Sequence, residues 1–204
     1  METVILWLDY AGVAVFAASG ALTASRKQMD IVGFCLIATV TGIGGGTLRD
    51  LLLDVGAVFW VWEPSYVLLC CGIAMVLFVT APFFESRFRA LLWADAVGLA
   101  VFCVTGAKTA LLTGAPVIVA VLMGVMTATF GGVLRDVLCA EVPLILRREI
   151  YATAAAAGAI TYIGMTAAGT GPVAAQLAGF AVALGARSFG ILSGFSLPTY
   201  RNRA

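Results

Sequence analysis

The sequence predicts an all-α membrane protein of seven transmembrane helices, arranged as an inverted three-plus-three repeat followed by a seventh helix. The first observation is composition: 62% of the residues are hydrophobic, only 11% are charged, and the mean hydropathy is +1.05. A soluble domain carries far more charge on its surface. The second observation is that the two halves of the chain resemble each other. We therefore treat residues 1–204 as a single transmembrane domain.

Apolar runs of bilayer-spanning length, about 20 residues each, follow one another with very short connections. We expect the seven spans at 4–24, 30–53, 64–84, 91–112, 115–139, 149–168 and 172–194. Connections this short leave no room for a soluble catalytic or ligand-binding domain. The function is therefore expected to lie within the bilayer.

Basic residues outside the spans fall only in alternate connections and after the last span. They are Arg26, Lys27, Arg87, Arg89, Arg147, Arg148, Arg201 and Arg203. With seven spans, all of these positions lie on one side of the membrane. The positive-inside rule then predicts that the N-terminus is outside and the C-terminus is cytoplasmic.

The internal repeat aligns residues that lie 86 positions apart, as Asp9 and Asp95 do. "DYAGVAVFAASGALTA" from Asp9 matches "DAVGLAVFCVTGAKTA" from Asp95, and "GGTLRDLL" matches "GGVLRDVL". The copies, residues 4–84 and 91–168, each hold three spans, so the second enters the membrane from the opposite side. Inverted repeats place a pseudo-two-fold axis in the membrane plane, with interrupted helices near the midplane. The helix at 172–194 lies outside the repeat.

Glycine clusters occupy matching places in the second and fifth spans. They are Gly44, Gly45 and Gly46 in "TGIGGGTLRD" and Gly131 and Gly132 in the second copy. Glycine costs about 1 kcal/mol relative to alanine inside a helix, so we expect both helices to break there. An opened turn is tolerated only beside protein or water, which predicts a hydrated path near the hydroxyls of Thr41, Thr47, Thr127 and Thr129. The alternative is that these glycines only permit close helix packing.

Ionisable residues within the spans form a second group of candidates. They are Asp9, Arg49, Asp50, Asp95, Lys108, Arg135, Asp136 and Arg187. A charge at the bilayer centre costs roughly 2.5–3.5 kcal/mol, so these side chains are expected to face the bundle interior. Neighbouring residues point about 100° apart on a helix, which favours pairing between helices over pairing of Arg49 with Asp50 or of Arg135 with Asp136. The expected pairs join Arg49 and Arg135 to aspartates across the pseudo-two-fold, in either a structural or a gating role.

Lys108 has no counterpart in the first copy, where Leu22 aligns with it. It follows Asp95 by 13 residues, about 20 Å further along the span towards the outer side. One interpretation is a side chain that reaches the interface. The other is a voltage-sensitive gate, because one charge crossing the whole field yields about 2.3 kcal/mol per 100 mV.

Several classes of function are disfavoured. The net charge is +1 and the basic residues form no patch, so nucleic acid is not an expected partner. The five cysteines have no ligand spacing and the chain has no histidine, which predicts no metal site. We find no catalytic constellation and predict neither an enzyme nor a cofactor. The cysteines, expected to be apolar packing residues, are Cys35, Cys70, Cys71, Cys103 and Cys139.

The repeat, the doubled Gly-Gly-x-Leu-Arg-Asp motif and the stretch "VPLILRREIYA" at 142–152 resemble the trimeric intracellular cation channel family, in a prokaryotic member. The resemblance covers essentially the whole chain. It implies a homotrimer in a bacterial inner (plasma) membrane, surrounded by lipid, with one pore in each protomer. The kinked second and fifth spans would line that pore and pass K⁺ and also Na⁺. By the same resemblance, Lys108 matches a basic position of the fourth span implicated in gating.

A secondary transporter for a small zwitterion such as glycine is the alternative, because this domain also carries the label glycine transporter. Half-helix N-termini would then face a substrate carboxylate, and Asp50 or Asp136 would hold the amine. As a channel the protein would use freed carbonyls and threonine hydroxyls, without a filter of stacked carbonyls, so weak selectivity is expected. The sequence leaves both readings open.

Overall fold

The computed structural model describes residues 2–83, 86–147 and 149–195, and of residues 2–8 the backbone alone. Some residues used in the orientation and span predictions lie outside this part of the chain: Phe84, Arg148, Arg201 and Arg203.

Helices make up almost all of the described chain. The α-helices are α1 (Glu2–Arg26), α2 (Ile31–Leu53), α3 (Phe59–Trp62), α4 (Ser65–Thr80), α5 (Arg87–Leu112), α6 (Val117–Leu138), α7 (Ala152–Ala167) and α8 (Pro172–Ser193), with 3₁₀ turns η1 (Ala81–Phe83) and η2 (Leu144–Leu146). Among the described residues, five segments are long and apolar enough to cross a membrane: α2, α4 with η1, α5, α6 and α8. The protein is therefore a mostly helical membrane protein. Helix α3 and the two 3₁₀ turns are features that the sequence analysis did not predict.

The helix ends follow ordinary capping chemistry. Asp30 caps α2 by accepting a hydrogen bond from Gly33 N at 2.8 Å, and Ser86 caps α5 by accepting from Arg89 N at 3.3 Å. Such caps satisfy amide groups that have no partner within the helix. Pro172 opens α8, and Gly194 closes it with φ of +64°.

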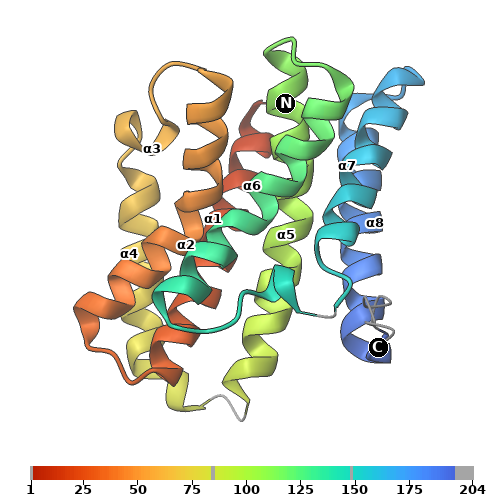
Figure 1. Ribbon diagram of the computed structural model, residues 1–204. Helices are drawn as coiled ribbons and strands as arrows, with labels where there is room; N and C mark the ends of the chain where they lie inside the picture. The colour runs from red at the N-terminus through yellow and green to blue at the C-terminus, as the bar shows by residue number, and fades with distance from the viewer. Residues whose placement is uncertain (1, 84–85, 148, 196–204) are drawn as a thin grey trace, which may run out of the picture.

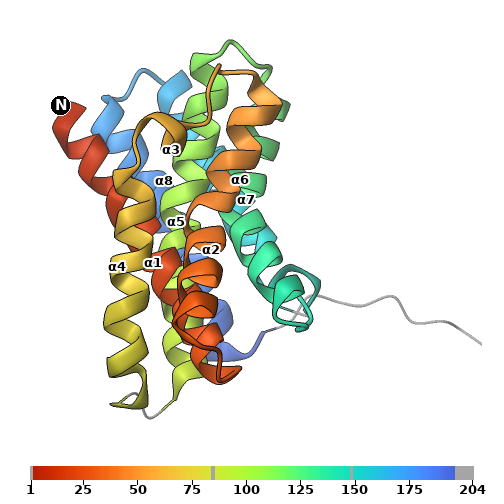
Figure 2. The same ribbon diagram turned by 90° about the vertical axis from the view of Figure 1, so that its left-hand side faces the viewer.

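Two groups of three helices pack side by side (Figures 1 and 2). In the first group α1, α2 and α4 contact one another, and in the second group α5, α6 and α7 do the same. The groups meet where α1 crosses α5 and where α2 crosses α6, while α8 packs on α5 and α7. Figure 1 shows the start of α1 and the end of α8 at opposite ends of the bundle.

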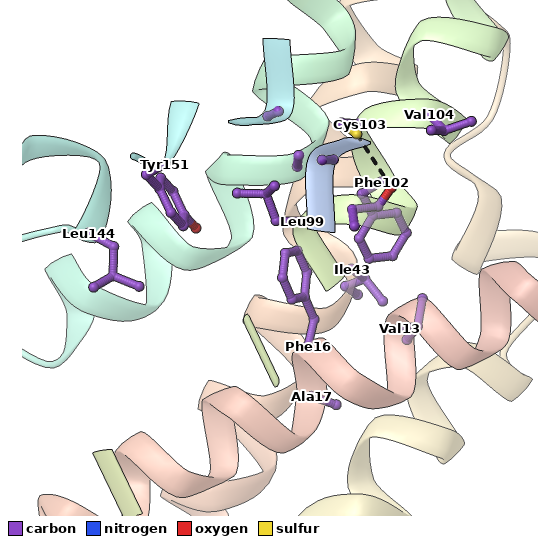
Figure 3. Close-up of a cluster of buried hydrophobic side chains, with 14 of the residues drawn as sticks. Val13, Phe16, Ala17, Ile43, Leu99, Phe102, Cys103, Val104, Leu144 and Tyr151 are labelled. Atoms are coloured by element: carbon purple, nitrogen blue, oxygen red, sulfur yellow. Dashed lines mark hydrogen bonds between the residues drawn. The ribbon is translucent and has the colours of Figure 1, made fainter. Parts of the chain in front are cut away.

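The crossing of α1 and α5 shows how the groups interlock (Figure 3). The rings of Phe16 and Phe102 lie 5.2 Å apart and are both almost fully buried. A Cβ added at Gly12 would lie 3.2 Å from Phe102 Cζ, and a Cβ added at Gly98 would collide with the Phe16 ring. Each phenylalanine thus packs against the glycine of the other helix.

The expected break in the second and fifth spans is wrong. Helix α2 runs without interruption from Ile31 to Leu53, through the triple glycine, and α6 runs without interruption from Val117 to Leu138. In Figure 1 the axis of α2 changes direction partway along, yet the ribbon stays helical. The energies explain this: glycine lowers helix stability by about 1 kcal/mol, whereas an opened backbone group in hydrocarbon costs several.

The glycines instead permit a close crossing of α2 and α6, the reading that the sequence analysis disfavoured for these clusters. A Cβ at Gly45 would collide with the carbonyl oxygen of Thr127, and a Cβ at Gly131 would collide with that of Thr41. Only glycine lets two backbones approach this closely. The crossing is reciprocal, because Gly45 aligns with Gly131 and Thr41 aligns with Thr127 in the repeat.

Candidate functional site

Part of the predicted path lies at the crossing of α2 and α6. There Gly45 and Gly131 meet the backbones of Thr127 and Thr41, and Gly44 faces Leu134. The other two glycines are buried against other elements, because a Cβ at Gly46 would meet the Phe59 ring and a Cβ at Gly132 would meet Tyr151 OH. Thr129 is also buried, and Thr47 is half-buried. The crossing is tight rather than open, so the residues that meet there are packing partners within continuous helices.

The threonine hydroxyls at the crossing bond to their own helices. Thr41 Oγ1 donates to Ile37 O at 2.6 Å, and Thr127 Oγ1 donates to Met123 O at 2.6 Å. Thr129 bonds in the same way to Val125 O at 2.9 Å. Thr47 differs, because its hydroxyl donates to Ile43 O at 2.8 Å and also accepts the indole N–H of Trp60 at 2.9 Å.

A pocket of about 290 Å³ lies directly beside this crossing. Helices α2 and α6 form its walls, and Trp60 of α3 completes it. The lining residues are Thr39, Val40, Ile43, Gly44, Thr47, Leu48, Leu51, Trp60, Phe130 and Leu134. Of the predicted path residues, only Gly44 and Thr47 line the pocket, whose walls are otherwise largely apolar.

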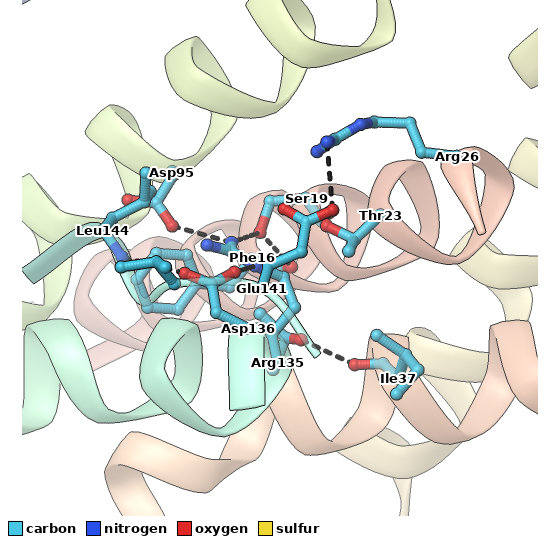
Figure 4. A network of polar contacts seen from close by, with 12 residues as sticks. Phe16, Ser19, Thr23, Arg26, Ile37, Asp95, Arg135, Asp136, Glu141 and Leu144 are labelled. Carbon is cyan, nitrogen blue, oxygen red and sulfur yellow. Dashed lines mark hydrogen bonds and ion pairs between the residues drawn. The ribbon is translucent and has the colours of Figure 1, made fainter. Parts of the chain in front are cut away.

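The Arg-Asp pair of the second copy is the centre of a fully buried ion network (Figure 4). Arg135 Nε donates to Asp136 Oδ1 at 2.8 Å, and Arg135 Nη1 donates to Asp95 Oδ1 at 2.8 Å. The same Nη1 donates to Ser19 Oγ of α1 at 2.9 Å. Arg135 and Asp95 are 0% exposed. One guanidinium thus links α5, α6 and α1.

The Arg-Asp pair of the first copy makes fewer contacts. Arg49 Nε donates to Asp50 Oδ1 at 2.8 Å, and the Arg49 guanidinium lies 5.9 Å from the centre of the Phe59 ring. Its side chain is 12% exposed. Asp9, the counterpart of Asp95, accepts a hydrogen bond from Tyr66 OH at 2.8 Å instead of from Arg49.

The predictions about pairing are therefore wrong in two respects. Arg49 pairs with Asp50 and Arg135 pairs with Asp136, although adjacent Cβ atoms diverge. The arginine side chain is long enough to reach the neighbouring carboxylate, so the divergence at Cβ does not limit the guanidinium. Among the described residues no arginine–aspartate ion pair crosses between the copies, and the bond of Arg135 to Asp95 joins two helices of the second copy.

The aspartate of each pair also holds the segment that follows its helix. Asp50 Oδ2 accepts from Phe59 N at 3.0 Å, which anchors α3. Asp136 Oδ2 accepts from Leu144 N at 2.9 Å, which anchors η2. These partners are backbone amides in very short elements, so no pattern of residues in the sequence predicts them.

The two remaining predicted cations behave differently. Arg187 of α8 is fully buried and bonds to Glu149 Oε2 at 2.8 Å and to Ile150 O at 2.9 Å, beside the Tyr151 ring. It therefore anchors the last helix to the segment before α7. Lys108 of α5 is half-buried and forms no ion pair with any side chain that the structure describes.

Sequence reasoning missed a cluster of charges around Glu141, at the end of α6. Glu141 contacts Arg26 at 3.0 Å, Lys27 at 3.4 Å and Arg147 at 3.8 Å. Arg26 and Arg147 both lie against the ring of Phe88. The sequence offers a weak signal, since Arg26, Lys27 and Arg147 all fall in connections on one side of the membrane.

Comparison with known proteins identifies relatives along the whole chain. The family model described as "Glycine transporter" matches residues 6–82 and 92–167. The UPF0126 membrane protein of Vibrio cholerae is 39% identical over 98% of this chain and 84% of that protein. The UPF0126 inner membrane protein YadS of Escherichia coli is 40% identical over 96% of each chain.

Solved structures agree with these matches. The TRIC trimeric intracellular cation channel orthologue from Rhodobacter sphaeroides is 54% identical, with a TM-score of 0.92 over 95% of this chain and 100% of that chain. A prokaryotic TRIC channel crystallised in 0.5 M KCl is 31% identical, with a TM-score of 0.90 over 97% of this chain and 100% of that one. The chain therefore belongs to the trimeric intracellular cation channel family, as a prokaryotic member, and the matching family model describes the same domain as a glycine transporter.

Proposed function

We propose that the protein is a channel for monovalent cations, passing K⁺ with weak selectivity over Na⁺. The observation that carries this proposal is the match, at 54% identity and a TM-score of 0.92, to the trimeric intracellular cation channel orthologue from Rhodobacter sphaeroides. Weak selectivity follows from the chain itself. The threonine hydroxyls and glycine backbone of α2 and α6 form no stack of free carbonyls that could replace a particular hydration shell.

The proposed path runs inside each protomer between α2 and α6. The pocket beside Gly44 and Thr47 forms one part of it, and the crossing at Gly45 and Gly131 is its constriction. Because the two backbones touch at the crossing, conduction requires α2 and α6 to separate there. Glycines suit such a contact, because they have no side chains that would have to disengage when the two helices separate.

Two observations support the proposed inverted repeat, with copies at 4–84 and 91–168 and a seventh helix at 172–194. The family model matches the chain in two separate segments. The contacts between the copies are reciprocal: Gly45 meets Thr127 as Gly131 meets Thr41, and Gly12 meets Phe102 as Gly98 meets Phe16. A two-fold axis between equivalent units requires this kind of isologous contact.

Assembly and orientation are part of the same proposal. We place the protein as a homotrimer in a bacterial inner membrane, because the matching solved structure is described as a trimeric channel and a relative is named an inner membrane protein. The N-terminus would face outside and the C-terminus the cytoplasm. The clustering of Arg26, Lys27 and Arg147 around one acid at the same end of the bundle supports this orientation.

A glycine carrier is the second candidate, favoured by the description of the matching family as a glycine transporter. In that case, Asp50 or Asp136 would hold the substrate amine. Both carboxylates are nearly fully buried and already bonded to an arginine and to a backbone amide, so they have little capacity left for a substrate.

Recording from purified protein in a planar bilayer separates the two functions. The channel proposal predicts unitary current steps in symmetric K⁺ and a small shift of reversal potential when Na⁺ replaces K⁺ on one side. Saturable glycine uptake into proteoliposomes without unitary currents would contradict the channel and support the carrier. Protein heated to unfold it before reconstitution is the control for leaks.

We also propose that Lys108 contributes to gating. The side chain is half-buried in α5, and no ion pair holds it among the side chains that the structure describes, so its amine is available to move in a field. Lys108→Ala is expected to reduce the steepness of voltage-dependent opening. The matched control is Arg89→Ala, which removes a charge from the other end of the same helix. Unchanged voltage dependence in Lys108→Ala would remove the gating role.

A further inference from the structure

Three polar atoms of the second-copy network have no hydrogen-bond partner among the described residues. They are Asp95 Oδ2, Arg135 Nη2 and Tyr151 OH. All three side chains are at most 1% exposed, so bulk solvent does not reach them. A buried polar atom without a partner is costly, and native proteins satisfy nearly all such atoms.

The three atoms come from different elements and converge at Gly132 of α6. A Cβ built on Gly132 would lie 3.0 Å from Tyr151 OH and 3.5 Å from Arg135 Nη2. It would also lie 3.4 Å from Oδ1 of Asp95, the oxygen of that carboxylate that Arg135 Nη1 already bonds. Gly132 thus presents no side chain to a corner walled by polar groups of α5, α6 and the residue before α7.

We propose that this corner binds one ordered water molecule. The water would accept a hydrogen bond from Arg135 Nη2, donate one to Asp95 Oδ2 and form a third with Tyr151 OH. Buried waters typically make about three such bonds to groups that otherwise lack partners. The site therefore has the number and the mixture of donors and acceptors that a water requires.

Charged ligands fit the same corner poorly. Arg135 is paired with two carboxylates, Asp95 and Asp136, so the cluster already carries a net negative charge that opposes an anion. A cation would lie against the N–H groups of Arg135, which donate and cannot accept. An uncharged ligand that both donates and accepts is the remaining chemistry.

The water would belong to the second copy alone. Ser65 aligns with Tyr151 in the repeat, and its hydroxyl bonds to Tyr10 OH at 2.6 Å and to Glu63 Oε1 at 2.7 Å. Asp9 Oδ2, the counterpart of Asp95 Oδ2, already accepts a bond from Tyr66. The equivalent corner of the first copy is therefore satisfied by side chains.

A crystal structure at a resolution that shows ordered waters tests the proposal, with a second data set from crystals soaked in Tl⁺. The expected result is a density peak within hydrogen-bond distance of all three atoms and no anomalous signal at that peak. A direct bond between Tyr151 OH and Asp95 without such a peak would overturn the proposal. An anomalous Tl⁺ peak would also overturn it, because the ligand would then be a cation.

Two tyrosine variants add a solution test that does not depend on conduction. Tyr151→Phe keeps the ring beside Arg187 but removes one partner of the water, so its melting temperature is expected to fall below that of the wild type. Tyr162→Phe in α7 is the matched control, because the Tyr162 hydroxyl is not among the buried atoms without partners. Equal melting temperatures for Tyr151→Phe and the wild type would count against the hydrogen bond to water.

Discussion

The two Arg-Asp pairs occupy equivalent places in the two halves, yet they serve different structures. Arg135 is 0% exposed and bonds to Asp95, Asp136 and Ser19, which joins three helices. Arg49 is 12% exposed and bonds to Asp50 alone, near the ring of Phe59. Of the two pairs, only the second is a buried cross-helix network.

Neighbouring residues explain the difference. In the first half Tyr66 donates to Asp9, so this carboxylate is already satisfied without the arginine. In the second half the tyrosine nearest in position, Tyr151, has an unpartnered hydroxyl and Arg135 satisfies Asp95. Ser19 and Thr105 are aligned and each donates to its own helix, but only Ser19 also accepts a hydrogen bond from an arginine, Arg135. The same motif therefore joins three helices in the second half, whereas in the first half it forms an ion pair within one helix, beside the pocket.

The largest expected effect comes from removing the central guanidinium. Arg135→Ala leaves two carboxylates buried without their partner, which we expect to lower the free energy of unfolding by about 3–5 kcal/mol. Arg49→Ala is the matched variant. Its loss is expected to be about 1–2 kcal/mol, because Asp50 keeps its bond to the Phe59 amide. Denaturant unfolding in detergent measures both, and equal losses would erase the contrast between the halves.

The glycines of the α2–α6 crossing should be equally intolerant of a side chain. Gly45→Ala and Gly131→Ala each push a methyl group against a backbone carbonyl, at an expected cost of about 1–3 kcal/mol. Thermal unfolding of the two variants tests the reciprocity of the contact. If one substitution is tolerated and the other is not, the two crossing contacts are not equivalent.

A third pair of equivalent positions, Gly72 and Gly158, differs between the halves because only the second half packs against α8. A Cβ at Gly158 would lie 2.6 Å from Ala183 Cβ of α8, whereas a Cβ at Gly72 meets nothing within 4 Å. Gly158→Ala is expected to destabilise the protein. Gly72→Ala is expected to be neutral or to stabilise it by up to about 1 kcal/mol through helix propensity. Monomeric protein in detergent is the sample for this comparison, and a similar loss in both variants would contradict it.

The smallest effect concerns the hydrogen bond that holds α3 over the pocket. Trp60→Phe keeps an aromatic ring but removes the indole N–H that donates to Thr47, with an expected loss of about 0.5–1.5 kcal/mol. Trp62→Phe is the control, because Trp62 is 79% exposed. Protease accessibility of the segment between α2 and α4 reports the same change locally. Identical cleavage of the two variants would mean that the Trp60–Thr47 bond does not hold α3.

Much of the fold could be predicted from the sequence, because hydrophobic length and the repeat are strong signals. A helix lies in each of the seven predicted ranges, and the comparisons confirm the family that the motif at Gly45–Asp50 and its second copy indicates. Short irregular elements were missed. Helix α3 has only four residues and depends on contacts with Asp50 and Thr47, which no local pattern announces.

The site was less predictable, for two physical reasons. Glycine propensity indicated a break at Gly44–Gly46, but tertiary packing of α2 on α6 outweighs about 1 kcal/mol per residue. The directions of the Cβ atoms indicated that the side chains of Arg49 and Asp50 diverge, but the arginine side chain is long enough to reach the carboxylate of Asp50. Asp9 bonds to Tyr66 rather than to Arg49. This partner could not be predicted from the repeat either, because Tyr66 aligns with Ala152 in the second copy.

The central claim is that ions cross each protomer between α2 and α6, and a reversible crosslink tests it most directly. A Cβ at Gly44 would lie 2.9 Å from Leu134 Cδ1, so Gly44→Cys and Leu134→Cys place one thiol on α2 and one on α6 at adjoining positions of the pocket lining. The background carries replacements of the five native cysteines, and the two single variants are the controls. The account predicts that oxidation abolishes unitary K⁺ currents and that reduction restores them. Currents of unchanged amplitude in fully crosslinked protein would contradict it.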